Sequence, residues 1–402
     1  MPMTATAGNR GDSVRSDCFV QMTKTEQQAT EIRLQSKVES LYGDSIRELC
    51  HEVLIHYNLR NVFVEIEDKG ALPFVTAARL ESAIRELTGT EESFLLPVET
   101  RNLHRTRRDR TRRTRLYLPG NNPKLMLNAG IYGSDGIILD LEDSVAPDKK
   151  VEARLLVRNA LRAVDFGDAE RMVRINQLPA GLEDLDYIIP EQVNLILIPK
   201  CENAQQIVQV EERIEKILGQ ENTDIYLMPI IESTLGVVNA YEIASASPNV
   251  AVLAIGLEDY TADLGAQRTA EGRESFYARS AVVNAARAAG VQPIDSVFSE
   301  IDDMEALRNN VLESKALGFA GMGCIHPRQV PVINEGFSPD GQEIEKAKRI
   351  MEAFEQAREK GLGVVALGSK MIDAPVVKRA VHTIELAIQS GKLSTNWREN
   401  HE

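Results

Sequence analysis

The stretch GIILDLEDS, residues Gly136 to Ser144, decides the fold of this chain of 402 residues. Its apolar run from Ile137 to Leu139 is typical of a strand that is buried on both faces. Three acids follow where such a strand would leave the core, and they mark either a functional site or an ordinary polar loop: Asp140, Glu142 and Asp143. The same plan recurs in VRINQ, ILIPK, LMPIIES, LAIGLED and GCIHP. This recurrence favours a site.

Strands and helical segments alternate from Arg115 onward. Eight strands are expected in TRLYLPG, GIILDLED, RMVRINQ, NLILIPK, DIYLMPIIES, VAVLAIGLED, QPIDSVFSE and GFAGMGCIHP. Eight strands that are each followed by a helix predict the α/β class and a closed (β/α)8 TIM barrel, with the active site at the C-terminal ends of the strands. A flavodoxin-like open sheet is the alternative, but it seldom needs eight parallel strands. Two more helices, separated by the segment GVVALGSKMID, form a C-terminal extension.

The residues before the barrel predict a small α/β sandwich. EIRLQS, from Glu31 to Ser36, and NVFVEIED both alternate as strands, and an amphipathic helix follows each of them. The first 20 or so residues lack periodicity, and we expect them to be mobile. We therefore expect four parts: a small domain (1–88), a basic linker (89–112), the barrel (113–340) and the extension (341–402).

Charge and composition exclude several classes of protein. The net charge of -14 disfavours a nucleic-acid partner. Eight arginines nevertheless lie between Thr100 and Arg115, and they form either a binding strip for a phosphate-bearing, CoA-like group or a tether attracted to the acidic body. No stretch is apolar enough for a membrane span or a signal peptide, so we expect a cytoplasmic protein that does not bind membranes. The four separated cysteines argue against a zinc cluster or a disulfide framework.

Two carboxylates point to a metal site. Glu232 and Asp259 end the fifth and sixth expected strands, which are neighbours in a barrel, so both can reach one hard cation. Two carboxylates, completed by water and substrate oxygens, are what Mg²⁺ favours, whereas a lone acid at a strand end is more often a helix cap. Arg174, at the end of the third strand, can hold a carboxylate or a developing enolate oxygen, or can pair structurally with Glu142 or Asp143.

Residues 112–395 resemble the citrate lyase beta subunit and the wider HpcH/HpaI family. The motifs that carry this resemblance are RLYLPGNNP, LDLEDSV with Lys150 and Ala153-Arg154 after it, VRIN, IPK, IESTLG, GLEDYTADL, IHPRQ and GLGVVALGSKMIDAP. The resemblance implies that Glu232 and Asp259 bind Mg²⁺. It also implies substrate or catalytic roles for Arg115, Arg174, Glu142, Asp143 and Asp373. Of these, Asp373 would be an acid/base from a neighbouring subunit. Met322 stands where relatives commonly have Lys, which puts any CoA or carboxylate contact from this position in doubt.

Residues 5–88 resemble the acyl carrier protein, or gamma subunit, of citrate lyase, through GDSIREL, NVFVEIEDKGAL and TAARLESAI. That family carries a phosphoribosyl-dephospho-CoA arm on a serine close to an acid. The family usually leaves one residue between the serine and the acid, whereas here Ser16 adjoins Asp17 directly and Arg15 occupies the expected place. Ser16 is the expected attachment residue, Ser13 is the alternative, and a domain without an arm is a third possibility.

Together the resemblances imply a lyase that cleaves a carrier-bound citryl thioester to oxaloacetate and an acetyl thioester. They also imply an acyltransferase (alpha) subunit as a partner and a homo-oligomer, either a trimer or a hexamer. A lyase for citramalyl or malyl thioesters, including free CoA thioesters, is the first alternative. A non-catalytic carrier scaffold is the second, although it predicts a damaged metal pair, and Glu232, Asp259 and Arg174 are all present.

Overall fold

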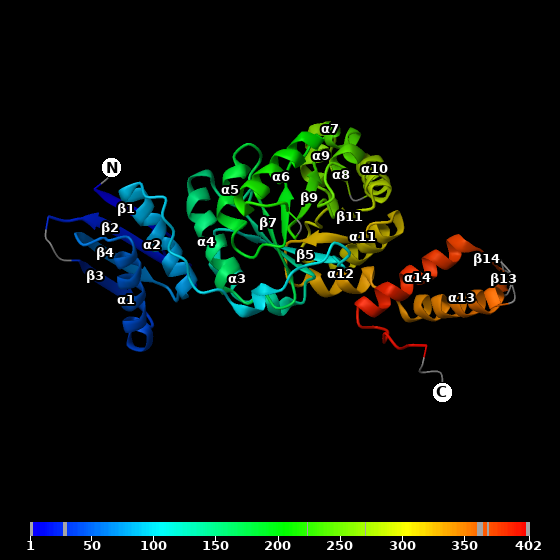
Figure 1. Cartoon of the computed structure of the whole chain (residues 1–402), viewed down its shortest axis with the longest axis horizontal. Coiled ribbons are helices and arrows are strands. Elements are labelled where there is room, and N and C mark those ends of the chain that lie inside the picture. The colour runs from blue at the N-terminus through cyan, green and yellow to red at the C-terminus, as the bar shows by residue number, and fades with distance from the viewer. Residues whose placement is uncertain are drawn as a thin grey trace.

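The computed structural model describes residues 3–26, 30–222, 224–269, 271–359, 365–367 and 370–398. A small N-terminal domain, a barrel and a helical extension follow one another along the chain (Figure 1). The predicted α/β class and (β/α)8 barrel are confirmed, whereas the exact domain boundaries remain predictions. None of the helices in these ranges has the length and apolar content that a membrane span requires. All four cysteines are buried and free.

The N-terminal domain is one sheet covered by two helices. Its strands lie in the order β1-β2-β4-β3, and only β3 and β4 are parallel. The strands are β1 (Thr4–Gly8), β2 (Cys18–Lys24), β3 (Glu31–Ser36) and β4 (Val62–Asp68), and the helices are α1 (Glu39–His56) and α2 (Pro73–Thr88). Side chains of β4 alternate between buried and half-buried, as period-2 hydrophobicity requires. The helices contact each other and the sheet, so the domain has two layers.

The expectation of a mobile N-terminus is wrong. Residues 4–8 form the edge strand β1, which pairs antiparallel with β2 from Thr4↔Thr23 to Gly8↔Phe19. Ala5 and Ala7 are buried while Thr4 and Thr6 are exposed, so β1 does alternate, but its apolar side chains are too small to give a strong pattern.

The barrel is closed by eight parallel strands in the order β10-β11-β12-β5-β6-β7-β8-β9. They are β5 (Thr114–Pro119), β6 (Gly136–Asp140), β7 (Glu170–Arg174), β8 (Leu195–Ile198), β9 (Tyr226–Ile231), β10 (Val252–Ile255), β11 (Gln292–Asp295) and β12 (Gly321–Cys324). Seven of these strands lie within the predicted segments, and β7 begins one residue before its segment, at Glu170. A core of inward-facing side chains fills the barrel and includes Ile138, Met172, Leu195, Leu197, Met228 and Ile230.

The helices after the strands form the outer layer of the barrel. They are α3 (Pro123–Met126), α4 (Lys150–Ala163), α5 (Gly181–Ile188), α6 (Ala204–Leu218), α7 (Thr234–Val238), α8 (Ala240–Ala244), α9 (Leu257–Leu264), α10 (Arg273–Ala289), α11 (Met304–Leu317) and α12 (Gln329–Phe337). A second, larger apolar core fills the space between these helices and the strands. Met322 belongs to this outer core, so its side chain faces the helices and not the barrel interior.

The arginine-rich linker crosses the N-terminal face of the barrel. Arg112 is buried and pairs at 2.7 Å with Glu170, the first residue of β7. Arg108 and Arg110 donate to backbone carbonyls that precede the strands, those of Pro248, Val250, Gly290, Asp135 and Asp168. These groups occupy the face opposite the expected active site. The structure therefore favours the tether over the binding strip.

The C-terminal extension projects from the barrel as a helical hairpin (Figure 1). It consists of α13 (Gly341–Glu359), β13 (Val365–Leu367), β14 (Lys370–Ile372) and α14 (Ala374–Gln389), and the two short strands pair antiparallel. A small core of its own, which includes Ile344, Ile350, Ile384 and Trp397, holds the two helices together.

Candidate active site

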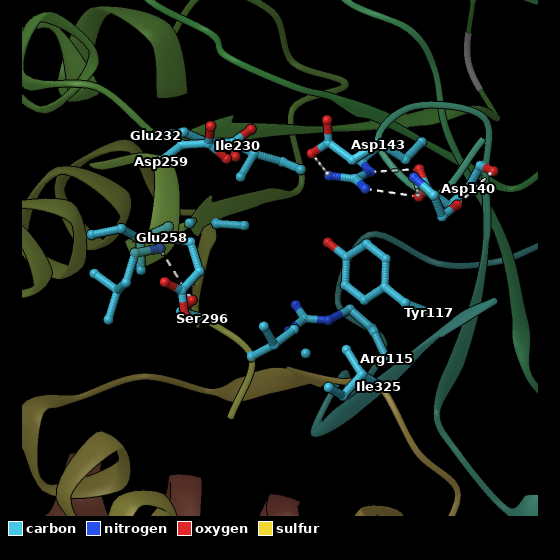
Figure 2. Close-up of a pocket in the computed structure, with 18 of the residues that line it drawn as sticks. Arg115, Tyr117, Asp140, Asp143, Ile230, Glu232, Glu258, Asp259, Ser296 and Ile325 are labelled. Atoms are coloured by element: carbon cyan, nitrogen blue, oxygen red, sulfur yellow. Dashed lines mark hydrogen bonds and ion pairs between the residues drawn. The ribbon is translucent and has the colours of Figure 1, made fainter. Parts of the chain in front are cut away.

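A cavity of about 480 Å³ opens at the C-terminal ends of the barrel strands. Its walls include five of the predicted site residues, Arg115, Asp143, Arg174, Glu232 and Asp259. Figure 2 shows Glu232 and Asp259 together on one side, Asp140 and Asp143 on another, and Arg115 beyond Tyr117. The active face of TIM-barrel enzymes is this same end of the strands, because the loops after the strands converge there.

Arg174 is fixed by acids from the neighbouring strand. Asp140 ends β6 in register with Arg174 of β7, and its two oxygens accept bonds of 2.6 and 2.8 Å from the guanidinium. Burial disfavours the ionised carboxyl, but these bonds outweigh burial and hold the pKa of Asp140 below its usual range. The Arg174 guanidinium also lies 5.4 Å from the centroid of the Tyr117 ring, a cation–π distance. Arg174 is therefore both a structural partner and a wall of the cavity.

Glu142 and Asp143 complete the acidic surroundings of Arg174. Glu142 lies 2.8 Å from Arg174 Nη1 and Asp143 lies 3.5 Å from it. Glu142 Oε2 is buried and is the oxygen that pairs with Arg174, whereas Oε1 accepts a hydrogen bond from Gln177. Burial raises the pKa of Glu142. Both carboxylate oxygens of Glu142 are therefore engaged, and they help to hold the Arg174 guanidinium at the wall of the cavity.

Glu232 and Asp259 lie after neighbouring strands, Glu232 directly after β9 and Asp259 in the first turn of α9. Glu232 is 6% exposed, and its Oε1 accepts a 3.0 Å bond from the backbone N–H of Lys200. Its Oε2 would lie 2.9 Å from a Cβ at Gly256, so only glycine leaves room for this carboxylate. The Lys200 ammonium lies 3.1 Å from Asp259. Burial, assisted by the charge of Asp259, raises the pKa of Glu232 to about 7.

These donors fit magnesium. A buried carboxylate whose pKa is raised partly by a second carboxylate becomes easier to ionise when a cation lies between the two. Among the described residues, no three His, Cys, Asp or Glu side chains gather closely enough to hold a metal by themselves. Mg²⁺ commonly takes only one or two protein carboxylates and completes its shell with water and substrate oxygens.

Lys200 is part of the IPK motif, and the sequence predicts no role for it. It follows β8, has φ +46°, and contacts both predicted metal ligands, Glu232 through its backbone and Asp259 through its ammonium. A non-glycine residue at positive φ is uncommon, and such residues are concentrated at functional sites. Its position at a strand end was the signal that could have identified it.

The two candidate attachment serines lie on the loop between β1 and β2. Ser13 is exposed and Ser16 is half-buried with φ +57°. The neighbouring Asp17 is buried and pairs at 3.0 Å with Arg79 of α2. The backbone N–H of Gly8, at the end of β1, donates a 2.8 Å bond to Glu152 in the first turn of α4.

This contact fixes where the serine loop lies relative to the cavity. A helix that follows a barrel strand begins at the C-terminal face, and α4 begins just after the loop that carries Glu142 and Asp143. Lys150, the first residue of α4, donates to the backbone carbonyls of Leu141 and Glu142 at 2.7 and 2.6 Å. The two ends of the serine loop, Gly8 and Asp17, are therefore held at the end of the barrel where the cavity opens.

Asp373 is not brought to the cavity within this chain. It precedes α14, and its side chain accepts a 3.2 Å bond from the backbone N–H of Val376 as a helix cap. The described residues that line the cavity do not include it. Figure 1 places β14, which ends just before Asp373, at the far end of the extension. The shared-site role of Asp373 thus stays a prediction.

Comparison with known proteins identifies the family to which the barrel belongs. A profile of the family described as HpcH/HpaI aldolase/citrate lyase matches residues 113–327. The chain belongs to the HpcH/HpaI family. Residues 4–87 match a second profile, an acyl-carrier family described as malonate decarboxylase delta subunit. The chain thus joins a carrier-like domain to an HpcH/HpaI barrel.

Its relatives in the HpcH/HpaI family are lyases. The citrate lyase beta subunit of Leuconostoc mesenteroides is 40% identical over 284 residues, which are 69% of this chain and 94% of that protein. The human mitochondrial citramalyl-CoA lyase is 33% identical over 69% of this chain and 85% of that protein. A crystal structure of CitE from Mycobacterium tuberculosis with magnesium, acetoacetate and coenzyme A is 28% identical with a TM-score of 0.58, covering 71% of this chain and all of that one. This chain is accordingly a carbon–carbon lyase.

Proposed function

We propose that this chain is a magnesium-dependent lyase that cleaves a citryl thioester, held on its own carrier domain, to oxaloacetate and an acetyl thioester. The observation that carries the proposal is one cavity whose walls include Glu232, Asp259 and Arg174, at the barrel end where the carrier-like domain docks. The 40% identity to a citrate lyase beta subunit supports the choice of substrate.

The reaction breaks the bond between C2 and C3 of the citryl group. The C3 hydroxyl loses its proton and becomes the keto group of oxaloacetate, while C2 leaves as the enolate of the acetyl thioester and gains a proton. Magnesium held by Glu232 and Asp259 would polarise the C3 hydroxyl and carboxylate oxygens. Arg174, oriented by Asp140, offers positive charge to the reacting oxygens, and Glu142 with Asp143 would hold water beside it.

The thioester would be presented on a phosphoribosyl-dephospho-CoA arm attached to Ser16, or to Ser13 as the alternative. Both serines lie on the loop docked at the cavity end of the barrel, which supports delivery within one chain. A separate acyltransferase (alpha) subunit would load the arm, because no part of this chain resembles one.

We propose further that the chain is a homo-oligomer in which Asp373 of one copy protonates the acetyl carbon in the cavity of another. Large apolar side chains are exposed on α7, α8 and α10: Leu235, Val238, Tyr241, Phe276 and Tyr277. A patch of this kind is typical of a protein interface, which supports a neighbouring copy here. The apolar residues Val364, Val365, Leu367 and Met371 before Asp373 also predict an interface, but the structure does not describe their side chains.

The experiment is a comparison of three CoA thioesters, citryl, citramalyl and malyl, with purified protein and Mg²⁺. Oxaloacetate, pyruvate and glyoxylate are measured as the respective products. We expect oxaloacetate to form fastest. Faster release of pyruvate would favour the second candidate, a citramalyl-CoA lyase, which the 33% identical human enzyme supports. No cleavage of any of the three would contradict the lyase assignment and support a carrier scaffold.

A further inference from the structure

Arg115 is a cation buried inside the barrel without an acidic partner. It is the second residue of β5, is 2% exposed, and lines the cavity. Its Nε has no hydrogen-bond partner, and Nη1 reaches only the sulfur of Met228, at 3.8 Å. Burial lowers the pKa of Arg115 to about 10, as expected for a buried guanidinium that forms no ion pair with a carboxylate.

The other cations of this region are paired. Arg174 is held by Asp140, and Lys200 contacts Asp259. In the linker, Arg112 binds Glu170 and the other arginines reach acids or backbone carbonyls. Within the described ranges, Arg115 is therefore the cavity-lining cation that has no carboxylate partner.

The barrel is shaped around this side chain. Its register neighbours on the two adjacent strands are both glycines, Gly136 on β6 and Gly323 on β12. A Cβ at Gly136 would lie 3.3 Å from Cγ of Arg115 and 2.4 Å from the end of Met172, so a larger residue would push both side chains away. Burying an unpaired charge is costly. A cavity whose wall holds a buried cation without an acidic partner is therefore expected to bind an anion.

We infer that Arg115 binds the carboxymethyl carboxylate of a citryl substrate and thereby selects citryl over citramalyl and malyl thioesters. The inference rests on the proposed function. The three substrates share the C3 hydroxyl, the C3 carboxylate and the thioester arm. They differ in the remaining substituent, which is a carboxymethyl group in citryl, a methyl group in citramalyl and a hydrogen in malyl.

The position of Arg115 supports this assignment. The thioester has to leave through the mouth toward the carrier loop, and the hydroxyl and carboxylate belong beside Glu232 and Asp259. The remaining substituent then points along the barrel axis into the floor of the cavity. Arg115 lies two residues deeper along β5 than Tyr117, which places its guanidinium on that floor (Figure 2).

The test compares Arg115→Met and Arg115→Lys with the parent chain, with Arg171→Met as the control. Arg171 is an equally buried arginine of β7 that donates to the carbonyls of Gln192 and His104 and is not part of the cavity lining. We expect Arg115→Met to lower the ratio of kcat/KM for citryl-CoA to that for citramalyl-CoA on the order of 10²-fold, because the substrate carboxylate loses its partner. Arg115→Lys should retain part of the ratio, and Arg171→Met should leave it unchanged.

Binding of free products gives a readout independent of turnover. Calorimetry in the presence of Mg²⁺ should show that oxaloacetate loses affinity in Arg115→Met, whereas pyruvate, which lacks the second carboxylate, does not. The melting temperature of Arg115→Met should not fall, since the change removes a desolvated charge.

An unchanged substrate ratio together with unchanged oxaloacetate affinity would overturn the inference while leaving the lyase assignment intact. A lower melting temperature of Arg115→Met, with the substrate ratio of kcat/KM and the oxaloacetate affinity both unchanged, would show that Arg115 has only a structural role. If no thioester were cleaved but oxaloacetate still bound through Arg115, the proposed function would fail and the anion site would stand.

Discussion

Arg79 of the carrier-like domain and Glu152 of the barrel form a buried ion pair at 2.9 Å. Arg79 is 1% exposed and also binds both oxygens of Asp17, so one guanidinium links the serine loop to the start of α4. A second buried pair, Arg158 with Glu81 at 2.6 Å, joins α4 to α2 further along the same contact. The carrier-like domain is therefore docked on the barrel in a defined orientation and is not merely connected to it.

Replacing Arg79 with Met should loosen this docking. The change leaves Asp17 as a buried charge without its cationic partner and leaves Glu152 paired with Lys149 alone. Removing one partner of a buried ion pair costs about 3–5 kcal/mol. We expect faster proteolysis of the linker and greater hydrogen exchange in β1 and α4. Arg33→Met is the matched control, because Arg33 pairs with Glu65 on the exposed surface of the same sheet. Equal protection of Arg79→Met and the parent chain would contradict a docked carrier.

Replacing Glu232 or Asp259 with Ala should abolish Mg²⁺ binding and turnover without unfolding the barrel. Each side chain lies at a strand end and contributes little to the core, so circular dichroism should be unchanged. Calorimetric titration with Mg²⁺ measures the binding directly. Asp263→Ala provides the control, since Asp263 lies on the same helix α9 but only accepts bonds from Thr234. Undiminished turnover in Asp259→Ala, or in excess chelator, would exclude the metal assignment.

Asp373→Asn should retain Mg²⁺ and substrate binding yet lose activity by roughly 10²- to 10⁴-fold, as expected when a positioned acid/base is removed. Mixing this variant with Arg174→Ala should restore part of the activity, because a hybrid oligomer contains one site with both intact residues. Subunit exchange is verified with differently tagged chains. If exchange occurs and no activity returns, Asp373 does not act across subunits.

Protein from its native host should carry the mass of the arm within residues 11–18, on Ser16. Intact-mass and peptide mass spectrometry locate it. Ser16→Ala should lose the added mass and the carrier-dependent reaction, whereas Ser13→Ala should lose neither. The reverse pattern would assign the arm to Ser13. An unmodified peptide in active protein would contradict the proposal of an arm and would favour free CoA thioesters as substrates.

The pair between Asp140 and Arg174 should make the barrel sensitive to acid. The pKa of Asp140 is lower in the folded chain than its unfolded value of about 4, so its stabilising contribution is complete above that pH and is lost as the pH falls through the folded pKa. Asp140→Asn should therefore melt at a lower temperature than the parent chain at pH 7. The difference should shrink as the pH falls below that unfolded value and through the folded pKa. A difference that stays constant with pH would show that packing, and not ionisation, is responsible.

Much of the architecture could be predicted because the strands carry a strong local signal. Strands such as β6 and β8 are continuous apolar runs, and neighbours in the barrel follow chain order, which is why Glu232 and Asp259 could be placed side by side. The strand β2 alternates Cys18, Val20 and Met22 and could also have been found, whereas the small alanines of β1 gave little signal.

The details of the site needed three-dimensional information. The sequence suggested Glu142 or Asp143 as the partner of Arg174, but the main partner is Asp140. The reason is that the register of β6 and β7 places Asp140 opposite Arg174. The lack of an acidic partner for Arg115 could not be predicted either, because it depends on which side chains all the surrounding strands place near Arg115. The docking of α2 on α4 depends on charges nearly 80 residues apart, Glu81 and Arg158.

The ion pairs between α2 and α4 also set how often a loaded arm meets its target. The carrier-like domain and the barrel occur in a fixed 1:1 stoichiometry, and the proposed arm, rooted at the serine loop, would explore only the volume that its own length allows. Short tethers of this kind give effective concentrations in the millimolar range, independent of how dilute the protein is. A carrier domain that cannot leave the barrel also cannot shuttle to another enzyme. Whichever acyltransferase charges the arm must therefore travel to this docked pair and reach the serine loop from the solvent side.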